Sequence, residues 1–262
     1  MSTITLSVSG KTATLTLNRA EKRNALNQAM WQQLADYCDE LEQQIKPKVL
    51  LITAAGEQAF SAGADIQELN GLLADSAALA ANNAIVQAAQ LKLQRLSCVT
   101  IALINGLCVG GGLGIALCCD FRIAVASARF AITPARLGLL YSLEDTRRLV
   151  NIVGLARAKS LLLTGELIDG QTALSWGLVH QLLSPEQSSP EQLAARGDTL
   201  CQQLLAVSGV SLRGIKQTLA HLAGDAAFPE QRVRPLFDEA FSQQDFQRAA
   251  LAFINKTAVE FD

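Results

Sequence analysis

The chain has 262 residues, half of them hydrophobic, which is enough for one large domain or for a domain with an appendage. Its formal net charge of −2 gives no electrostatic case for nucleic-acid binding. No unbroken apolar run reaches the roughly 18 residues of a membrane span, and no basic region precedes an apolar one at the N-terminus. We therefore expect no secretory signal, no membrane contact and no nucleic-acid partner.

Strand and helix patterns alternate along the first half of the chain, which indicates an α/β fold. Polar and apolar residues alternate over 3–9 and 12–18, on either side of Gly10, and predict a hairpin. Asn27 can cap a helix that runs to about residue 45. Further strands are expected at 48–54, 99–104 and 121–126, and helices at 65–69 and from about 76 to 97.

The second half reads as mostly helical, apart from a short strand near residues 178–183. The segment 184–190, SPEQSSP, is the best candidate for a boundary. We therefore predict a core at residues 1–188 and a helical C-terminal region at residues 189–262. Helices in that region are expected at 191–206, 210–222, 229–241 and 245–256.

Six cysteines occur in or beside apolar segments, and none of them forms a CxxC pair. Such cysteines are typical of buried free thiols in a reducing compartment, so we expect a cytoplasmic protein. The neighbouring Cys118 and Cys119 point in different directions on a helix, so they cannot share a metal ion, and no metal site is expected. The cysteines are Cys38, Cys98, Cys108, Cys118, Cys119 and Cys201.

A glycine turn stands in the middle of the chain, in IALINGLCVGGGLGIALCCD at residues 101–120. It predicts a buried strand, a tight turn at 110–112 and a buried helix, whose free N–H groups would face a negative oxygen. That oxygen could belong to a phosphate or to a reaction intermediate, or the turn could serve packing alone. The dinucleotide fingerprint fails, because its third glycine would fall on Ile115 or Leu117.

A second stretch, GEQAFSAGADIQEL at residues 56–69, decides between these readings. Together the two segments resemble the crotonase superfamily, also called the enoyl-CoA hydratase/isomerase family. The match continues in register through LNRAEKRNALN at 17–27, FAITPARLG at 130–138 and LLLTGELIDGQTALSWGLV at 161–179. The resemblance implies an α/β, crotonase-like spiral of ββα repeats with a C-terminal helical trimerisation region. It also implies a homotrimer or a dimer of trimers, and a coenzyme A thioester as substrate without a separate cofactor.

The same resemblance implies the site residues. The thioester oxygen would lie between the backbone N–H groups of Ala64 and Gly111, which can stabilise an enolate without a titrating side chain. Lys22 and Arg23 would face the phosphates of CoA, although a solvated basic loop is an alternative, and Lys256 is a weaker candidate. The complete expected set of substrate-binding residues is Lys22, Arg23, Ala25, Ala62, Asp65, Ile66 and Gly110.

Two departures from the family pattern bear on the reaction. Family hydratases carry glutamates at the positions of Gly114 and Pro134, and water addition needs such groups. The segment FAITPARLGLLYS instead resembles methylmalonyl-CoA decarboxylases, and this resemblance implies that Thr133 and Tyr141 lie beside the reacting carboxylate. One departure is that those decarboxylases have a histidine at the position of Ala64. Our first hypothesis is therefore decarboxylation of a malonyl-type CoA, which yields the enolate without a general base.

Other readings stay open. Thr133 could cap a turn and Tyr141 could pack in the core, while Arg136 could pair with a substrate carboxylate or sit in a surface ion pair. The segment from Ser142 to Asp145 predicts a helix cap, but Glu144 or Asp145 could also be a displaced general base of a hydratase or isomerase. A non-catalytic acyl-CoA-binding subunit is a third possibility. We expect no catalytic role for His180 or His221, which lie outside the matched motifs.

Overall fold

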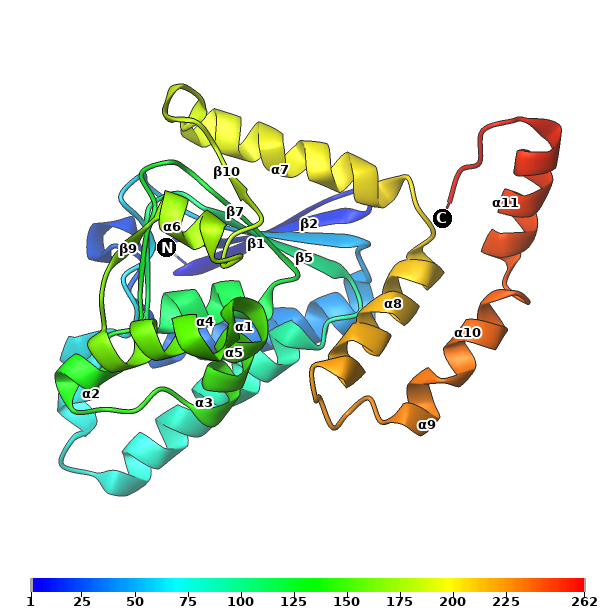
Figure 1. The fold of residues 1–262 in the computed structure, drawn as a ribbon. Helices are drawn as coiled ribbons and strands as arrows, with labels where there is room; N and C mark the ends of the chain where they lie inside the picture. Colours follow the sequence, from blue (N-terminus) through cyan, green and yellow to red (C-terminus); the bar gives the residue numbers. More distant parts are fainter. Residues whose placement is uncertain (1, 262) are drawn as a thin grey trace.

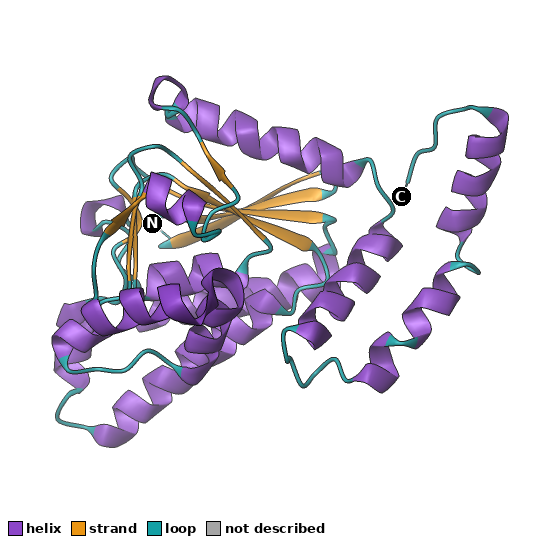
Figure 2. Cartoon of the chain, in the orientation of Figure 1, coloured by secondary structure: helices purple, strands orange, loops and turns teal. Residues whose placement is uncertain are grey.

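The computed structural model describes residues 2–261 and contains two β-sheets surrounded by helices (Figures 1 and 2). The six-stranded sheet has the order β1-β2-β3-β5-β7-β10 and the four-stranded sheet the order β4-β6-β8-β9. The larger sheet consists of β1 (Ile4–Ser9), β2 (Thr12–Leu17), β3 (Val49–Ala54), β5 (Val99–Ile104), β7 (Phe121–Ala124) and β10 (Gln181–Leu182). The smaller one consists of β4 (Ala59–Ser61), β6 (Leu107–Val109), β8 (Arg129–Ala131) and β9 (Ile168–Asp169).

The larger sheet starts with the predicted hairpin, in which β1 and β2 are antiparallel. All its later pairings are parallel, from β2 with β3 to β7 with β10. Every residue of β5 is buried, as expected for a parallel strand covered on both faces. The central strands therefore read as continuous apolar runs rather than alternating ones.

Three successive units each give one strand to the larger sheet, one to the smaller sheet, and then helix. They are β3-β4 with α2 (Ile66–Leu72) and α3 (Ser76–Gln94), β5-β6 with α4 (Gly111–Cys118), and β7-β8 with α5 (Leu143–Lys159). The predicted spiral of ββα repeats is thus present. The strands of the smaller sheet were not predicted, because two or three residues are too short to show an alternating pattern.

Helices cover both faces of the larger sheet. On one side lie α1 (Gln28–Glu40), α3 and α4, and on the other α7 (Pro190–Leu205) (Figure 1). Asn27 caps α1 as predicted, since its side chain accepts a hydrogen bond from the Met30 N–H. Residues Gly112–Cys118 of α4 are all buried, so this helix runs through the centre of the core.

The remaining helices are α6 (Gly170–Ser175), α8 (Gly209–Leu222), α9 (Glu230–Val233), α10 (Pro235–Ala240) and α11 (Gln244–Asn255). The helix predicted over 229–241 is in two pieces, because Pro235 has no N–H to donate. Figure 1 shows α9 to α11 as an arm that lies apart from the sheets, whereas α7 packs directly on the larger one. The division at residues 188 and 189 stays a prediction.

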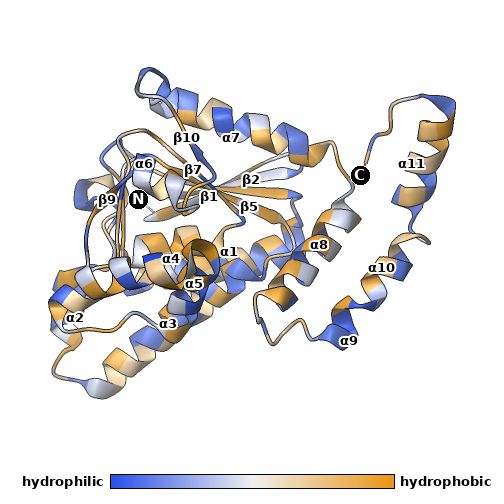
Figure 3. Ribbon diagram, viewed as in Figure 1, coloured by the Kyte–Doolittle hydropathy of each residue, from blue (hydrophilic) through white to orange (hydrophobic). Residues whose placement is uncertain are grey.

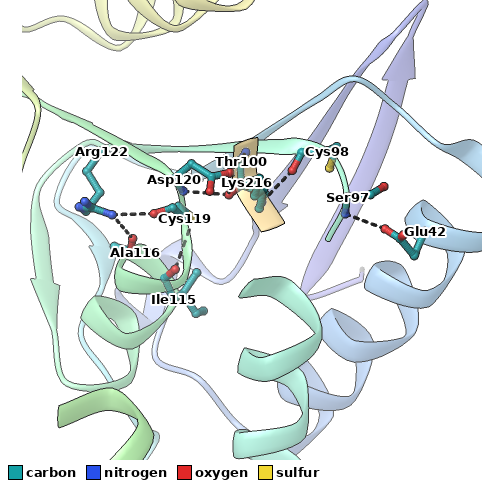
Figure 4. A network of polar contacts seen from close by, with 10 residues as sticks. All are labelled: Glu42, Ser97, Cys98, Thr100, Ile115, Ala116, Cys119, Asp120, Arg122 and Lys216. Carbon is teal, nitrogen blue, oxygen red and sulfur yellow. Dashed lines mark hydrogen bonds and ion pairs between the residues drawn. The ribbon is translucent and has the colours of Figure 1, made fainter. Parts of the chain in front are cut away.

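Helix α8 is fixed to the segment that follows α4. Lys216 Nζ donates to the Cys98 carbonyl oxygen at 2.8 Å and to Asp120 Oδ2 at 2.7 Å. Asp120 Oδ2 also accepts from the N–H and hydroxyl of Thr100 (Figure 4). On the other side, Arg122 Nη1 donates to the carbonyl oxygens of Ala116 and Cys119 in the last turn of α4. These bonds hold the buried helix whose first residues form the glycine turn.

All six cysteines are free and buried, as predicted. Burial raises the pKa of the Cys118 thiol to about 12 and that of Cys201 to about 11, so these thiols stay protonated at neutral pH. Within residues 2–261, no three His, Cys, Asp or Glu side chains are placed to hold a metal ion. No helix in this part of the chain is both long and apolar enough to cross a bilayer.

Candidate active site

The glycine turn and the AGAD loop lie against each other. A parallel bridge joins Leu26 to Ala64, with the Leu26 N–H donating to the Gly63 oxygen at 2.7 Å. A Cβ on Gly63 would stand 3.1 Å from the Val109 oxygen and 3.7 Å from the Gly111 nitrogen. Only a glycine allows this close approach of two backbones, so the turn at 110–112 and the loop at 62–65 form one structure.

Two backbone N–H groups at this junction are free to donate a hydrogen bond. Among residues 2–261, neither the Ala64 nor the Gly111 N–H has a hydrogen-bond acceptor within the chain. Gly111 is the first residue of α4, where a helix leaves its N–H groups unsatisfied. Ala64 is exposed. Two free donors on adjacent turns are what an oxygen that gains negative charge requires.

Lys22 and Arg23 lie on an exposed loop that is bonded to the loop at 62–65. Lys22 ends the short 3-10 helix Ala20–Lys22, and Arg23 follows it with a φ of +51°. The Ala62 N–H donates to the Arg23 carbonyl oxygen at 3.0 Å, which joins this loop to the loop at 62–65. Both basic side chains are exposed, so their charges are accessible to an anion bound beside the turn.

Arg19 holds that loop in place, although no pattern in the sequence marks this residue for that role. Its Nη1 donates to the Ala25 carbonyl oxygen at 3.1 Å and to Asp65 Oδ2 at 2.6 Å. Asp65 Oδ1 accepts from the first N–H groups of α2. The hydrogen bond from Arg19 lowers the pKa of Asp65 below its usual value. Both carboxylate oxygens of Asp65 thus have protein partners, and its expected part in substrate binding stays a prediction, as it does for Ala25, Ala62, Ile66 and Gly110.

A set of polar side chains surrounds Gly114, one turn into α4. A Cβ on Gly114 would stand 2.4 Å from Gln90 Nε2, 3.2 Å from Asp145 Oδ1 and 3.4 Å from the Tyr141 hydroxyl. These three side chains come from α3, from the first turn of α5 and from the loop before it. Because Gly114 has no side chain, an amide, a carboxylate and a phenol can all approach the helix at this position.

Asp145 is held in this place by two neighbours. Ser142 Oγ accepts from the Asp145 N–H at 3.0 Å, which confirms the predicted cap, and donates to Asp145 Oδ2 at 2.8 Å. Arg148 Nη1 donates to Asp145 Oδ1 at 2.8 Å, and both side chains are buried. Glu144 instead lines a separate cavity of about 700 Å³ between α3, α5 and α8. Of the two acids, Asp145 is the one beside Gly114.

Comparisons with known proteins show the family of the chain. A family model described as Enoyl-CoA hydratase/isomerase matches residues 8–262. The chain belongs to the enoyl-CoA hydratase/isomerase family. It is 30% identical to the short-chain-enoyl-CoA hydratase of Clostridium acetobutylicum, over 99% of this chain and 97% of that one. It is 31% identical to the crotonyl-CoA hydratase of Syntrophomonas wolfei, over 96% of this chain and 94% of the relative.

Solved structures show the same relationship. An enoyl-CoA hydratase/isomerase family protein from Hyphomonas neptunium superposes with a TM-score of 0.90 at 31% identity, covering 99% of this chain and 97% of that one. The resemblance seen in the sequence is therefore confirmed at the level of the family. At that level, the expectation of an enzyme that acts on acyl-CoA thioesters is supported. The relatives from Clostridium acetobutylicum and Syntrophomonas wolfei are both named as hydratases and not as decarboxylases.

Thr133 and Tyr141, the two residues expected beside the reacting group, have different surroundings. The Tyr141 hydroxyl donates to the Gly110 oxygen at 3.2 Å, which places it at the glycine turn. Burial and the nearby Asp145 raise its pKa well above the usual range, so it stays a donor. Thr133 precedes the 3-10 helix Pro134–Leu137, but its side chain makes no capping hydrogen bond, so the alternative role as a turn cap is wrong. No hydrogen bond in the described chain links Thr133 to Tyr141.

The other candidates of the sequence analysis lie elsewhere. Arg136 is exposed and donates weakly to the Thr164 carbonyl oxygen at 3.4 Å, a partner that is not an acid as the ion-pair alternative required. His180 accepts from the Arg122 N–H, and burial with the charge of Arg122 lowers its pKa to about 4. His221 Nδ1 lies 2.9 Å from the Phe228 oxygen. Lys256 is exposed just after α11.

Proposed function

We propose that this family member is an enoyl-CoA hydratase, which adds water to the C=C bond conjugated with a thioester and uses Asp145 for proton transfer. The observation that carries the proposal is the Asp145 carboxylate, with Oδ1 3.2 Å from where a Cβ of residue 114 would stand. That is the position from which the family resemblance expects a glutamate to act. The hydratase names of the relatives support the same reaction.

In this reaction the thioester oxygen accepts hydrogen bonds from the N–H groups of Ala64 and Gly111. Asp145 takes a proton from water while the water oxygen bonds to the β-carbon, and the C=C electron pair moves to form an enolate on the thioester oxygen. The α-carbon then takes the proton back from Asp145, and the carbonyl re-forms. The product is a 3-hydroxyacyl-CoA, and the enzyme returns to its starting state.

The same proposal assigns the exposed loop to the CoA end of the substrate. Lys22 and Arg23 are exposed on the loop that is bonded through the Arg23 carbonyl to the Ala62 N–H. Charge-assisted hydrogen bonds to phosphate suit such side chains. The acyl end then enters between the glycine turn and the loop that carries Tyr141.

Decarboxylation, the first hypothesis from the sequence, is less well supported. It depended on a site without a carboxylate, because a substrate carboxylate would be repelled by one. Asp145 lies within the group around Gly114, although Arg148 pairs with it. The retained Tyr141 hydroxyl at the glycine turn fits either reaction.

The test offers crotonyl-CoA and methylmalonyl-CoA separately to the purified protein and resolves the products by mass. We expect hydration of crotonyl-CoA and no CO2 from methylmalonyl-CoA. Asp145→Asn should lower hydration by roughly 10²–10⁴-fold, whereas Glu144→Gln, the neighbouring acid that faces another cavity, should retain it. Decarboxylation without hydration, or full hydration by Asp145→Asn, would overturn the proposal.

We also propose that copies of the chain assemble as a homotrimer or a dimer of trimers through the C-terminal arm. Figure 3 shows hydrophobic residues along α10 and α11, away from the sheets. Phe237 is 72% and Phe253 87% exposed, and large exposed apolar patches of this kind mark interfaces. The mass measured by sedimentation should be three or six times that of one chain. Phe253→Glu should lower the measured mass toward that of the monomer. A monomeric wild type contradicts this assembly.

A further inference from the structure

The amide of Gln90 occupies the space that the glycine at position 114 leaves open. Gln90 lies on α3 and is 1% exposed. Its Nε2 would be 2.4 Å from a Cβ on Gly114, closer than real Cβ contacts allow. Burial of an amide between two helices is unfavourable unless its polar atoms have partners. The placement of Gln90 therefore calls for a reason other than packing.

Only one half of this amide has a partner within the chain. Gln90 Oε1 accepts a long hydrogen bond from Arg148 Nη1 at 3.4 Å. Gln90 Nε2 donates to no group in residues 2–261, yet the only buried side-chain nitrogen or oxygen there without a partner is Asn105 Oδ1. Gln90 Nε2 therefore keeps some accessible surface, and it lies at the same position beside Gly114 that Asp145 Oδ1 and the Tyr141 hydroxyl approach.

We propose that Gln90 is a positioning residue that holds the reacting water for Asp145. This inference rests on the proposed hydration. A water between these groups donates one proton to the Asp145 carboxylate and accepts a hydrogen bond from Gln90 Nε2. Its second lone pair is then free to attack the β-carbon. An amide neither takes nor releases a proton at neutral pH, so proton transfer falls to Asp145 alone.

Gln90→Met tests this, because it keeps the length of the side chain and removes the amide. We expect kcat to fall roughly 10- to 100-fold, as misplacement of a reacting group does, with KM for crotonyl-CoA near that of the wild type. The matched control is Gln94→Met, one turn along the same helix. Gln94 Oε1 accepts the shorter bond, 2.6 Å, from the same Arg148, and we expect its loss to leave kcat near wild type.

A pH profile gives a second readout, which reports whether the side chain at position 90 faces Asp145 in the working enzyme. Gln90→Glu is nearly isosteric and places a second carboxylate beside Asp145. Two adjacent carboxylates resist simultaneous ionisation, so the acidic limb of kcat against pH should move to higher pH. An acidic limb that does not move would overturn the inference even if Gln90→Met fails to fold.

The outcomes separate this inference from the proposed function. Equal losses of kcat in Gln90→Met and Gln94→Met would mean that Gln90 acts only by holding Arg148, and the inference fails. A folded Gln90→Met enzyme with full kcat also overturns it, while a dead Asp145→Asn enzyme keeps the proposed function intact. Full hydration by Asp145→Asn overturns the proposed function itself.

Discussion

Gly63 and Gly111 are in backbone contact across the two loops of the site: a Cβ on Gly63 would stand 3.7 Å from the Gly111 nitrogen. Gly63 also has a φ of +96°, in the region that L side chains avoid. A side chain at position 63 would therefore press against the backbone of the glycine turn. The relative placement of the Ala64 and Gly111 N–H groups therefore depends on a glycine at 63.

Gly63→Ala should accordingly damage the site. The added Cβ is 3.1 Å from the Val109 oxygen. In addition, a positive φ costs a residue with a side chain about 1–2 kcal/mol. We expect a lower midpoint in urea and a kcat that falls more than KM changes. The control is Gly71→Ala in α2, where nothing lies within 4 Å of the new Cβ and stability should hold or rise. An unaltered kcat in Gly63→Ala would show that the two loops tolerate displacement.

Binding of CoA itself should depend on the basic loop. Joint replacement of Lys22 and Arg23 by alanine should weaken CoA binding by about 1–3 kcal/mol, as expected for charge-assisted bonds. The effect should shrink at high salt, because both side chains are exposed. Calorimetry with CoA measures it, and Lys159→Ala, an exposed lysine at the end of α5, is the control. Equal affinities in the two variants would remove the loop from the site.

The attachment of α8 should depend on Lys216. Lys216→Met leaves Asp120 and the Cys98 oxygen without their shared donor, and we expect a loss of about 1–3 kcal/mol in the free energy of unfolding. Arg234→Met is the matched control, since it breaks the exposed pair with Glu230, and such surface pairs contribute little. Urea denaturation of both variants gives the comparison, and equal midpoints would refute this role of Lys216.

Acid should destabilise the protein partly through His180. Its pKa is lowered to about 4 in the folded chain by burial and by Arg122, whereas an unfolded histidine titrates near about 6.5. Between those values the unfolded chain binds more protons, so stability falls as pH drops from about 6.5 to about 4. His180→Gln should flatten melting temperature against pH in that window. A slope that matches the wild type would place the titration in other groups.

The sequence locates the backbone donors because they lie in contiguous segments. The proposed roles of Gly111 and Ala64 depend on their backbone N–H groups, and the glycines around them mark the turns directly. The cap at Ser142 is equally local, so it was predicted and is confirmed. Residues that act through tertiary packing leave no such signal.

Gln90 shows why the rest could not be predicted. Gln90 stands in an alanine-rich helix outside every matched motif, and only the packing of α3 on α4 brings its amide to Gly114. The sequence left Glu144 and Asp145 as equal alternatives to a helix cap, and only the packing places Asp145 beside the glycine. Arg19 lies within a matched motif, but its bond to Asp65 joins segments that are distant in the chain.

An added methyl group at position 114 should have two opposite effects, a gain in helix stability and a displacement of Gln90. In an ordinary helix, replacing glycine by alanine raises the free energy of unfolding by up to about 1 kcal/mol. In Gly114→Ala the new Cβ would lie 2.4 Å from Gln90 Nε2 and 3.2 Å from Asp145 Oδ1, so the flexible glutamine must move away. We expect kcat to fall as in Gln90→Met.

A double-mutant cycle checks that cause. In a Gln90→Ala background there is no amide to displace, so adding Gly114→Ala should lower kcat little further and should recover helix stability. The two losses are then strongly non-additive, as expected for groups in contact. Independent, additive losses of kcat would mean that the methyl group acts on Asp145 or Tyr141 rather than through Gln90.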